Sequence, residues 1–293
     1  MTHKHEHQNQ SIKNIRLVFF LNLIFSLLEF VFGTFLNSAA IISDAVHDLG
    51  DSISVGLSWF FQKFSTKESN DKFSFGYQRF SLIGALITAV VLLIGSAAVI
   101  YRSIPILFNP QPVNTTGMFW FSFIAIGVNG YAAWLMHKGS SKNENFLNLH
   151  MLEDVLGWVG ILIVSIVIRF TDFYILDPIF SLLIAVYILI QALPKFYNTL
   201  MVFLERVPEG VDINSLEQNI LAINGVKDFS HFHIWSLDGE TNAFSVTLLV
   251  PEETISEGSR IKKDVRHLLD DLNVTHSTIE LVTDEKDLQK HAH

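Results

Sequence analysis

Two histidine–aspartate pairs with the same spacing lie inside apolar segments of this chain. His47 precedes Asp51 by four residues, and His150 precedes Asp154 by the same interval. At helical pitch, residues four apart fall on nearly the same face of a helix. Two imidazoles and two carboxylates are ligands that zinc accepts when thiolates are absent, and the chain has no cysteine. We therefore predict one tetrahedral zinc site made by two helices.

The apolar surroundings of these pairs indicate what the site does. A charged side chain in hydrocarbon costs roughly 2.5–3.5 kcal/mol on insertion scales, so it persists where it lines a pathway or binds something. Two carboxylates balance the charge of a divalent ion, which a site of low dielectric constant requires. Metal binding to such ligands must release protons. A site that holds metal or protons and faces each side in turn is a metal/proton antiporter, so we expect zinc to be the transported substrate.

Three acidic residues adjoin the two pairs, namely Asp44, Asp48 and Glu153. They either support the ligands or line a pathway for protons or metal, and solvation at helix ends is the alternative interpretation. Gly50, Gly157 and Gly160, around the pairs, favour the close helix approach that a shared site requires.

Composition and charge place the chain in a membrane. It has 293 residues, a mean hydropathy of +0.36 and only 17% charged residues, which is typical of an integral membrane protein. Apolar runs predict six spans, near 13–35, 39–62, 80–104, 116–137, 147–170 and 176–200. Lysine and arginine gather at the amino terminus and in the even-numbered loops, which predicts a multi-pass protein of the cell (inner) membrane with both termini in the cytoplasm. The acidic carboxy-terminal part argues against nucleic acid as a partner.

Three polar residues of the spans have structural interpretations. Glu29 in the first run and Asn129 in the fourth are interpreted as hydrogen-bonding groups between helices. Asp177, followed by Pro178, is interpreted as the start of the sixth helix, with its carboxylate near the positive end of that helix dipole.

After residue 208 the pattern changes to that of a small α+β domain. Amphipathic helices are predicted at 211–223 and 256–272, and strands at 226–235, 243–250 and 277–283. The predicted organisation is a histidine-containing tail at 1–12, a six-helix transmembrane domain at 13–205, a cytoplasmic domain at 206–285 and a tail at 286–293. The cytoplasmic domain is large enough to fold but marginal alone, so dimerisation through it would be unsurprising.

These motifs together resemble the cation diffusion facilitators, membrane zinc transporters with six spans and a cytoplasmic carboxy-terminal domain. The resemblance covers about 15–283 and is carried by segments 38–51, 75–79, 150–154, 176–178, 225–226 and 233–235. It implies a transport site at His47, Asp51, His150 and Asp154 that takes zinc, with cadmium or cobalt as further substrates. It also implies a homodimer, proton exchange and a ferredoxin-like fold for the cytoplasmic domain.

The chain departs from some relatives in that family at other metal sites. Phe73 and Tyr77 stand where those relatives have histidines in the loop before the third span, so we predict no zinc site there. Ser230 and Thr247 stand at metal-ligand positions of the zinc-sensing tail domain, which makes the family's binuclear site doubtful. A variant cytoplasmic metal site would use residues on the non-core face of the sheet, namely His231, His233, His276 and Glu280.

Histidines also mark the two ends of the chain. His3, His5 and His7 alternate in the amino-terminal tail, where they predict weak zinc capture or, alternatively, a solvated tail or a purification remnant.

Three functional classes compete. A zinc exporter working by proton antiport explains the charged spans, and a transporter selective for cadmium, cobalt, manganese or iron is its variant. A membrane-anchored metal sensor or scaffold would explain the tail domain but not the charged spans. An intramembrane metalloprotease needs a general base and an open coordination position, and no His-Glu-x-x-His motif occurs, so we expect no enzyme.

Overall fold

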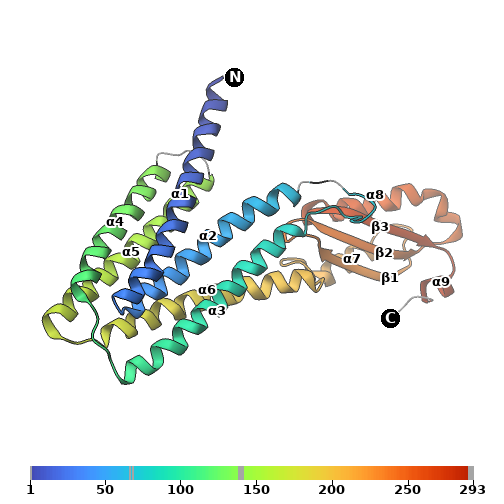
Figure 1. Cartoon of the computed structure of the whole chain (residues 1–293). Coiled ribbons are helices and arrows are strands. Elements are labelled where there is room, and N and C mark those ends of the chain that lie inside the picture. The colour runs from blue at the N-terminus through green and yellow to red at the C-terminus, as the bar shows by residue number, and fades with distance from the viewer. Residues whose placement is uncertain (1, 66, 68, 138–141, 290–293) are drawn as a thin grey trace. The chain divides into compact units, whose positions relative to one another are not determined.

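The computed structural model describes residues 2–65, 67, 69–137 and 142–289, which divide into two compact units. Within the described residues, six long helices form the first part of the chain (Figure 1). They are α1 (Thr2–Phe35), α2 (Ala39–Ser65), α3 (Phe80–Phe108), α4 (Thr115–His137), α5 (Lys142–Thr171) and α6 (Leu176–Phe203). Each predicted apolar run lies in one of these helices, and the predicted fold class of a polytopic helical membrane protein with an α+β domain is confirmed.

One helix of the bundle, α2, carries more acidic residues than the apolar stretches of the other five. Among the described residues, α1 from Arg16 onward, α3, α4, α5 from His150 onward and α6 are long and apolar enough to span a membrane. α2 has 27 residues, about 40 Å at 1.5 Å per residue, but it carries three aspartates. Two of these, Asp44 and Asp48, are only 4% and 0% exposed, so the polar side chains of α2 face other helices rather than lipid.

A residue of α6 fixes the start of α2. The Asp177 carboxylate accepts hydrogen bonds from Ser38 Oγ at 2.6 Å, from the Ala39 N–H at 2.6 Å and from the Ala40 N–H at 3.4 Å. Free N–H groups at a helix amino terminus carry partial positive charge, which a carboxylate stabilises. The sequence placed this carboxylate at the dipole of its own helix. That interpretation is confirmed, since α6 begins at Leu176 and has Asp177 in its first turn. The buried side chain of Asp177 in addition caps the neighbouring helix.

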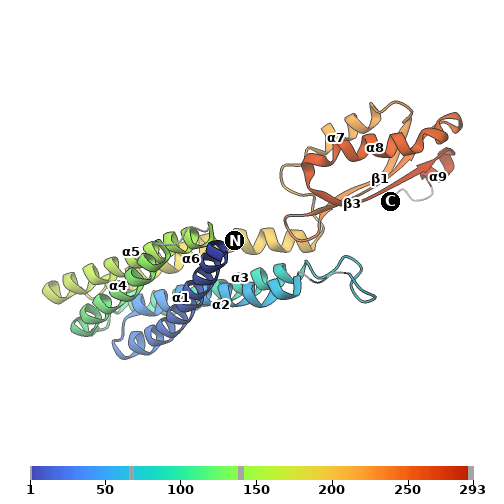
Figure 2. The ribbon, with the colours of Figure 1, turned by 90° about the horizontal axis from the view of Figure 1, so that it is seen from above.

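The second unit contains the carboxy-terminal domain, whose helix, strand, strand, helix, strand order agrees with the sequence prediction. Its elements are α7 (Ile213–Leu221), β1 (Asp228–Ser236), β2 (Asn242–Leu249), α8 (Gly258–Leu268), β3 (Val274–Val282) and α9 (Glu285–Gln289), with short 3-10 turns at Glu252–Glu257 and Asp270–Leu272. The sheet order is β1-β2-β3, with β1 antiparallel and β3 parallel to the central β2. Figure 2 shows α7 and α8 on one face of the strands.

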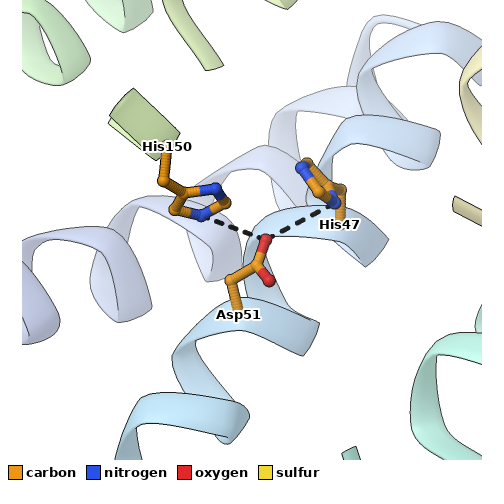
Figure 3. A group of neighbouring side chains, drawn as sticks. All are labelled: His47, Asp51 and His150. Atoms are coloured by element: carbon orange, nitrogen blue, oxygen red, sulfur yellow. Dashed lines mark ion pairs between the residues drawn. The ribbon is translucent and has the colours of Figure 1, made fainter. Parts of the chain in front are cut away.

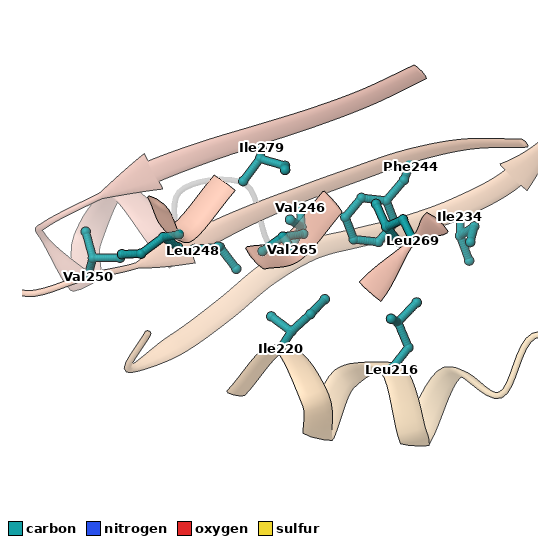
Figure 4. Close-up of a cluster of buried hydrophobic side chains, with 11 residues drawn as sticks. Leu216, Ile220, Ile234, Phe244, Val246, Leu248, Val250, Val265, Leu269 and Ile279 are labelled. Carbon is teal, nitrogen blue, oxygen red and sulfur yellow. The ribbon is translucent and has the colours of Figure 1, made fainter. Parts of the chain in front are cut away.

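The core of this domain lies between the sheet and those two helices (Figure 4). Phe244, Val246 and Leu248 alternate along β2 and are at most 1% exposed. They pack with Ile220 of α7 and Val265 of α8 in one buried cluster. The period-two pattern of β2 therefore directs its large side chains to one face, as a sheet covered by helices on that face requires.

The first strand departs from regular alternation. The pairing of β1 with β2 shifts between Ser230 and His233, and His231 has a φ of 50°. A bulge of this kind places extra residues on one strand and locally breaks the alternation of side chains. Because of this bulge, strict alternation does not determine the face of the sheet on which the His231 side chain lies.

Candidate metal site

Two helices supply the predicted membrane ligands. His47 and Asp51 lie one turn apart on α2, and His150 and Asp154 lie one turn apart on α5. Figure 3 shows the first three of these side chains converging between the helices, with the Asp51 carboxylate between the two imidazoles. One ligand atom from each of His47, Asp51 and His150 lies within 4.8 Å of the others. The structure thus gathers these three residues, which are far apart in sequence, into one cluster.

Asp51 is the centre of this cluster. Its Oδ2 atom lies 3.4 Å from His47 Nδ1 and 3.2 Å from His150 Nε2. Asp154 is slightly more distant, with Oδ1 3.8 Å from His47 Nε2 and Oδ2 3.9 Å from His150 Nε2. A tetrahedral zinc site with bonds of about 2.0–2.1 Å has ligand-to-ligand edges of about 3.3 Å. The contacts of Asp51 with the two histidines are therefore close to the spacing that a tetrahedral ion requires. Asp154 lies outside the group whose ligand atoms are all within 4.8 Å of one another, so it must move closer to complete the site.

The site is open on one side and closed on the other. The side chains of His47, Asp51 and His150 are 20%, 25% and 18% exposed, whereas that of Asp154 is 1% exposed. A cavity of about 510 Å³ reaches the first three residues and is also lined by Glu153 of α5 and Lys195 of α6. A cation can therefore approach the site through this cavity, while Asp154 forms its buried floor.

Glycines allow the helices that carry the site to pack closely. A Cβ added at Gly50 of α2 would collide with the Leu92 side chain of α3, which shows that this glycine serves the α2–α3 contact. A Cβ at Gly157 of α5 would lie at an ordinary 3.5 Å from Asp44 Oδ1. The expected close approach is therefore present, although Gly50 faces α3 rather than the helix that supplies the second ligand pair.

Comparison with known proteins identifies the family. Residues 15–204 match the cation efflux transmembrane domain, and residues 208–281 match the cytoplasmic domain of cation efflux proteins. The chain belongs to the cation efflux family, the cation diffusion facilitators. This confirms the resemblance predicted from the sequence. Members of this family are transporters, so the expectation that the protein is not an enzyme is also confirmed.

Relatives in this family align over nearly the whole chain. The chain is 32% identical to the cadmium, cobalt and zinc/H(+)-K(+) antiporter of Bacillus subtilis, over 96% of this chain and 92% of the relative. It is 28% identical to the metal cation efflux system protein CzcD of Cupriavidus metallidurans, over 95% of this chain and 89% of that protein. It is 26% identical to the zinc transporter ZitB of Pectobacterium atrosepticum, over 96% of this chain and 89% of that protein.

The acidic neighbours of the ligands in this cation efflux protein have two different environments. Glu153 is exposed and lines the cavity at the site. Asp44 and Asp48 are buried and form a second group with Glu29, in which one oxygen from each residue lies within 4.8 Å of the others. Glu29 was interpreted as a polar group between helices, and its carboxylate does lie against side chains of two other helices, Asp48 of α2 and Trp158 of α5. In the sequence, the feature that indicated a buried acidic group around Glu29 was a carboxylate inside an apolar run.

Two further polar residues, Asn129 and Lys195, lie in environments that the sequence did not predict. Asn129 is 1% exposed, and its side-chain amide has no hydrogen-bond partner within the described part of the chain, so its interpretation as an interhelical hydrogen-bonding group is wrong. Lys195 lines the cavity and acts electrostatically on Asp51, although no motif in the sequence indicates this role. Its signal was a lysine near the end of the last apolar run.

The histidines of the cytoplasmic domain do not converge in the same way. His231 and His233 have ring centroids 6.3 Å apart, and the ring of His276 contacts that of Phe75 at 5.3 Å. Glu280 accepts a hydrogen bond from Thr247 at 3.1 Å. Among the described residues, the groups that bring three ligand atoms within 4.8 Å are the two in the membrane helices. The variant cytoplasmic metal site stays a prediction.

The tail histidines fall outside what the structure describes in side-chain detail. The side chains of His3, His5 and His7 are among those not described, as are residues 290–293. Zinc capture by the amino-terminal tail likewise stays a prediction.

Proposed function

We propose that this cation efflux protein exports zinc in exchange for protons, by alternating access at a site of His47, Asp51, His150 and Asp154. The observation that carries the proposal is the convergence of His47, Asp51 and His150 at the end of an open cavity. Imidazole and carboxylate ligands suit zinc, and cadmium and cobalt are expected as further substrates. The printed names of the relatives in Bacillus subtilis and Pectobacterium atrosepticum support this set of metals.

Charge balance supports proton exchange. Two aspartates and two neutral histidines together carry the two negative charges that a divalent zinc ion cancels. When zinc leaves, those charges remain in a poorly solvated site, and protons or another cation must replace it. The Bacillus subtilis relative is named as an antiporter that uses protons and potassium, which supports a counter-cation of this kind.

The position of the cavity supports a conformation open toward the cytoplasm. Ser54 and Val55 of α2 and Lys195 of α6 line the cavity, and these residues lie toward the carboxy-terminal ends of their helices. The end of α6 leads directly into the segment that matches a cytoplasmic domain. Zinc would then enter from the cytoplasm and leave on the far side after the cavity closes and the floor at Asp154 opens.

The same proposal includes the domain order, the membrane topology and the oligomeric state of the protein. The tail at 1–12, the transmembrane domain at 13–205, the cytoplasmic domain at 206–285 and the tail at 286–293 would place both termini in the cytoplasm of a cell (inner) membrane protein. The match at 208–281 supports a homodimer formed through the cytoplasmic domain.

The test is zinc uptake into everted or reconstituted vesicles with an imposed pH gradient. Wild type is compared with Asp51→Ala and with Asp172→Ala, a charge-matched control in the α5–α6 connection. We expect gradient-dependent uptake to be lost in Asp51→Ala and retained in the control. Uptake that is unchanged in Asp51→Ala would show that metal crosses elsewhere. Absence of uptake in wild type, with metal still bound, would favour a membrane-anchored metal sensor.

A further inference from the structure

Three carboxylates meet inside the bundle, apart from the site described above. Glu29 of α1 and Asp44 and Asp48 of α2 each place one oxygen within 4.8 Å of the others. Their exposures are 0%, 4% and 0%. We call these three residues the acidic triad. It contains no imidazole, so its ligand atoms are oxygens alone.

The triad lacks the hydrogen bonds that normally satisfy buried carboxylates. Both oxygens of Glu29, both of Asp48 and Oδ2 of Asp44 have no hydrogen-bond partner among the described residues. The indole nitrogen of Trp158 on α5 is completely buried, also has no partner within that part of the chain, and faces the Glu29 carboxylate. Buried carboxylates without donors are costly, and inside a membrane they mark binding sites or pathways. The triad therefore requires a positively charged occupant or protons.

A polar connection joins the triad to the first site. The Asn22 side-chain amide donates to the Asp48 carbonyl oxygen at 3.4 Å and to Ser52 Oγ at 3.3 Å, and its own carbonyl oxygen Oδ1 has no partner within the described chain. A cavity of about 20 Å³ is lined by Asn22, Ser52, Asp51 and His150, and a volume of about 10–15 Å³ is enough for one water molecule. Asn22 thus contacts the backbone of one triad residue, Asp48, and lines a small cavity together with Asp51 and His150 of the first site.

The ligand set indicates the class of cation. Carboxylate oxygens without nitrogen or sulfur suit hard divalent cations such as Mn²⁺. A divalent cation would reduce the three negative charges of the ionised triad to one, whereas a monovalent cation would leave two.

We propose that Glu29, Asp44 and Asp48 form a second divalent-cation site, made of oxygen ligands alone and lying deeper in the bundle than His47, Asp51 and His150. Binding at the triad is independent of the proposed transport. If the triad is also a second position on the route of the exported metal, that role rests on the proposed function.

The experiment measures Mn²⁺ binding by electron paramagnetic resonance to the purified full-length protein in detergent at neutral pH. A double variant, His47→Ala with His150→Ala, removes both imidazoles and leaves the triad intact. In this background we expect Mn²⁺ to bind still, and Glu29→Gln to weaken the binding at least tenfold. The charge-matched control Asp172→Asn should leave it within twofold.

Further variants keep the test decisive if one of them does not fold. Asp44→Asn and Asp48→Asn should each reproduce the loss seen with Glu29→Gln, and size-exclusion chromatography with thermal unfolding checks that each protein is intact. The proposal is overturned if the folded double variant binds no Mn²⁺. It is equally overturned if binding is lost with Asp51→Asn but not with any triad variant, because protons alone then satisfy the triad. Zinc uptake by wild-type vesicles is measured separately, so a failure of transport is distinguished from a failure of the triad.

Discussion

His150 Nε2 lies 3.2 Å from Asp51 Oδ2, across the interface between α5 and α2. The same oxygen lies 3.4 Å from His47 Nδ1 on its own helix. One carboxylate oxygen thus connects the two histidine–aspartate pairs. The metal affinity of the site consequently depends on the packing of α2 against α5 as well as on the ligands themselves.

Replacing His47 with aspartate should broaden the selectivity of transport. An imidazole suits zinc, whereas a third carboxylate favours larger cations with longer metal–oxygen bonds. In competition experiments with reconstituted His47→Asp protein, we expect cadmium and manganese to compete with zinc more effectively than in wild type. His137→Asp, at the end of α4, is the control and should preserve the wild-type order. An unchanged zinc preference in His47→Asp would contradict the assignment of His47 as a ligand.

Zinc binding should release protons from the site. Ligands that hold protons in the absence of metal must give them up when zinc binds. Calorimetric titrations of the purified protein in buffers with different ionisation enthalpies should therefore report a net release of about one to two protons per zinc. Asp51→Ala should lower that number. Equal heats in all buffers would exclude coupling between zinc and protons at this site.

Removing the charge of Lys195 should strengthen metal binding. Its ammonium group lines the cavity beside Asp51 and repels an incoming cation. For Lys195→Met we expect an apparent zinc affinity higher by about threefold to tenfold and most distinct at low ionic strength, where charges are less screened. Lys195→Arg retains the charge and should behave like wild type. If both variants bind zinc equally, the charge of Lys195 has no role in binding.

Removing the Asp177 carboxylate should destabilise the transmembrane domain. It accepts hydrogen bonds from Ser38 and from the first N–H groups of α2, which would be left buried without an acceptor. We expect Asp177→Ala to cost about 2–4 kcal/mol of unfolding free energy, and Ser38→Ala about 1 kcal/mol. Thermal unfolding of the two proteins in the same detergent gives the comparison. A smaller effect for Asp177→Ala than for Ser38→Ala would contradict the role of this cap.

Two glycines of the carboxy-terminal domain allow the cost of a positive φ to be compared with the added cost of a steric collision. Gly210 and Gly225 have φ values of 83° and 94°, but only Gly225 is crowded, since an added Cβ would lie 2.6 Å from Thr254 Cγ2. Gly210→Ala should cost about 1 kcal/mol, because a side chain there disfavours a positive φ. Gly225→Ala should cost at least about 2 kcal/mol, because the collision adds to that strain. Amide hydrogen exchange of the sheet in both variants measures the difference.

The sequence by itself determined the helices and the ligand types. Long apolar runs form helices in a membrane because every backbone polar group must find a partner within the segment. The spacing of His47 with Asp51 placed both on one helix face, and the period-two pattern of β2 directed Phe244, Val246 and Leu248 to one face of the sheet. These features depend on local geometry, which is why they could be predicted.

Only the tertiary structure decided which residues of different helices meet. Local spacing does not show that Asp177 of α6 caps α2, or that Glu29 of α1 lies against Asp44 and Asp48. It also does not show that Lys195 lines the same cavity as Asp51. The physical reason is that residue spacing in the sequence determines which side chains share a helix face. The rotation of each helix and its position in the bundle are determined by packing against neighbouring helices.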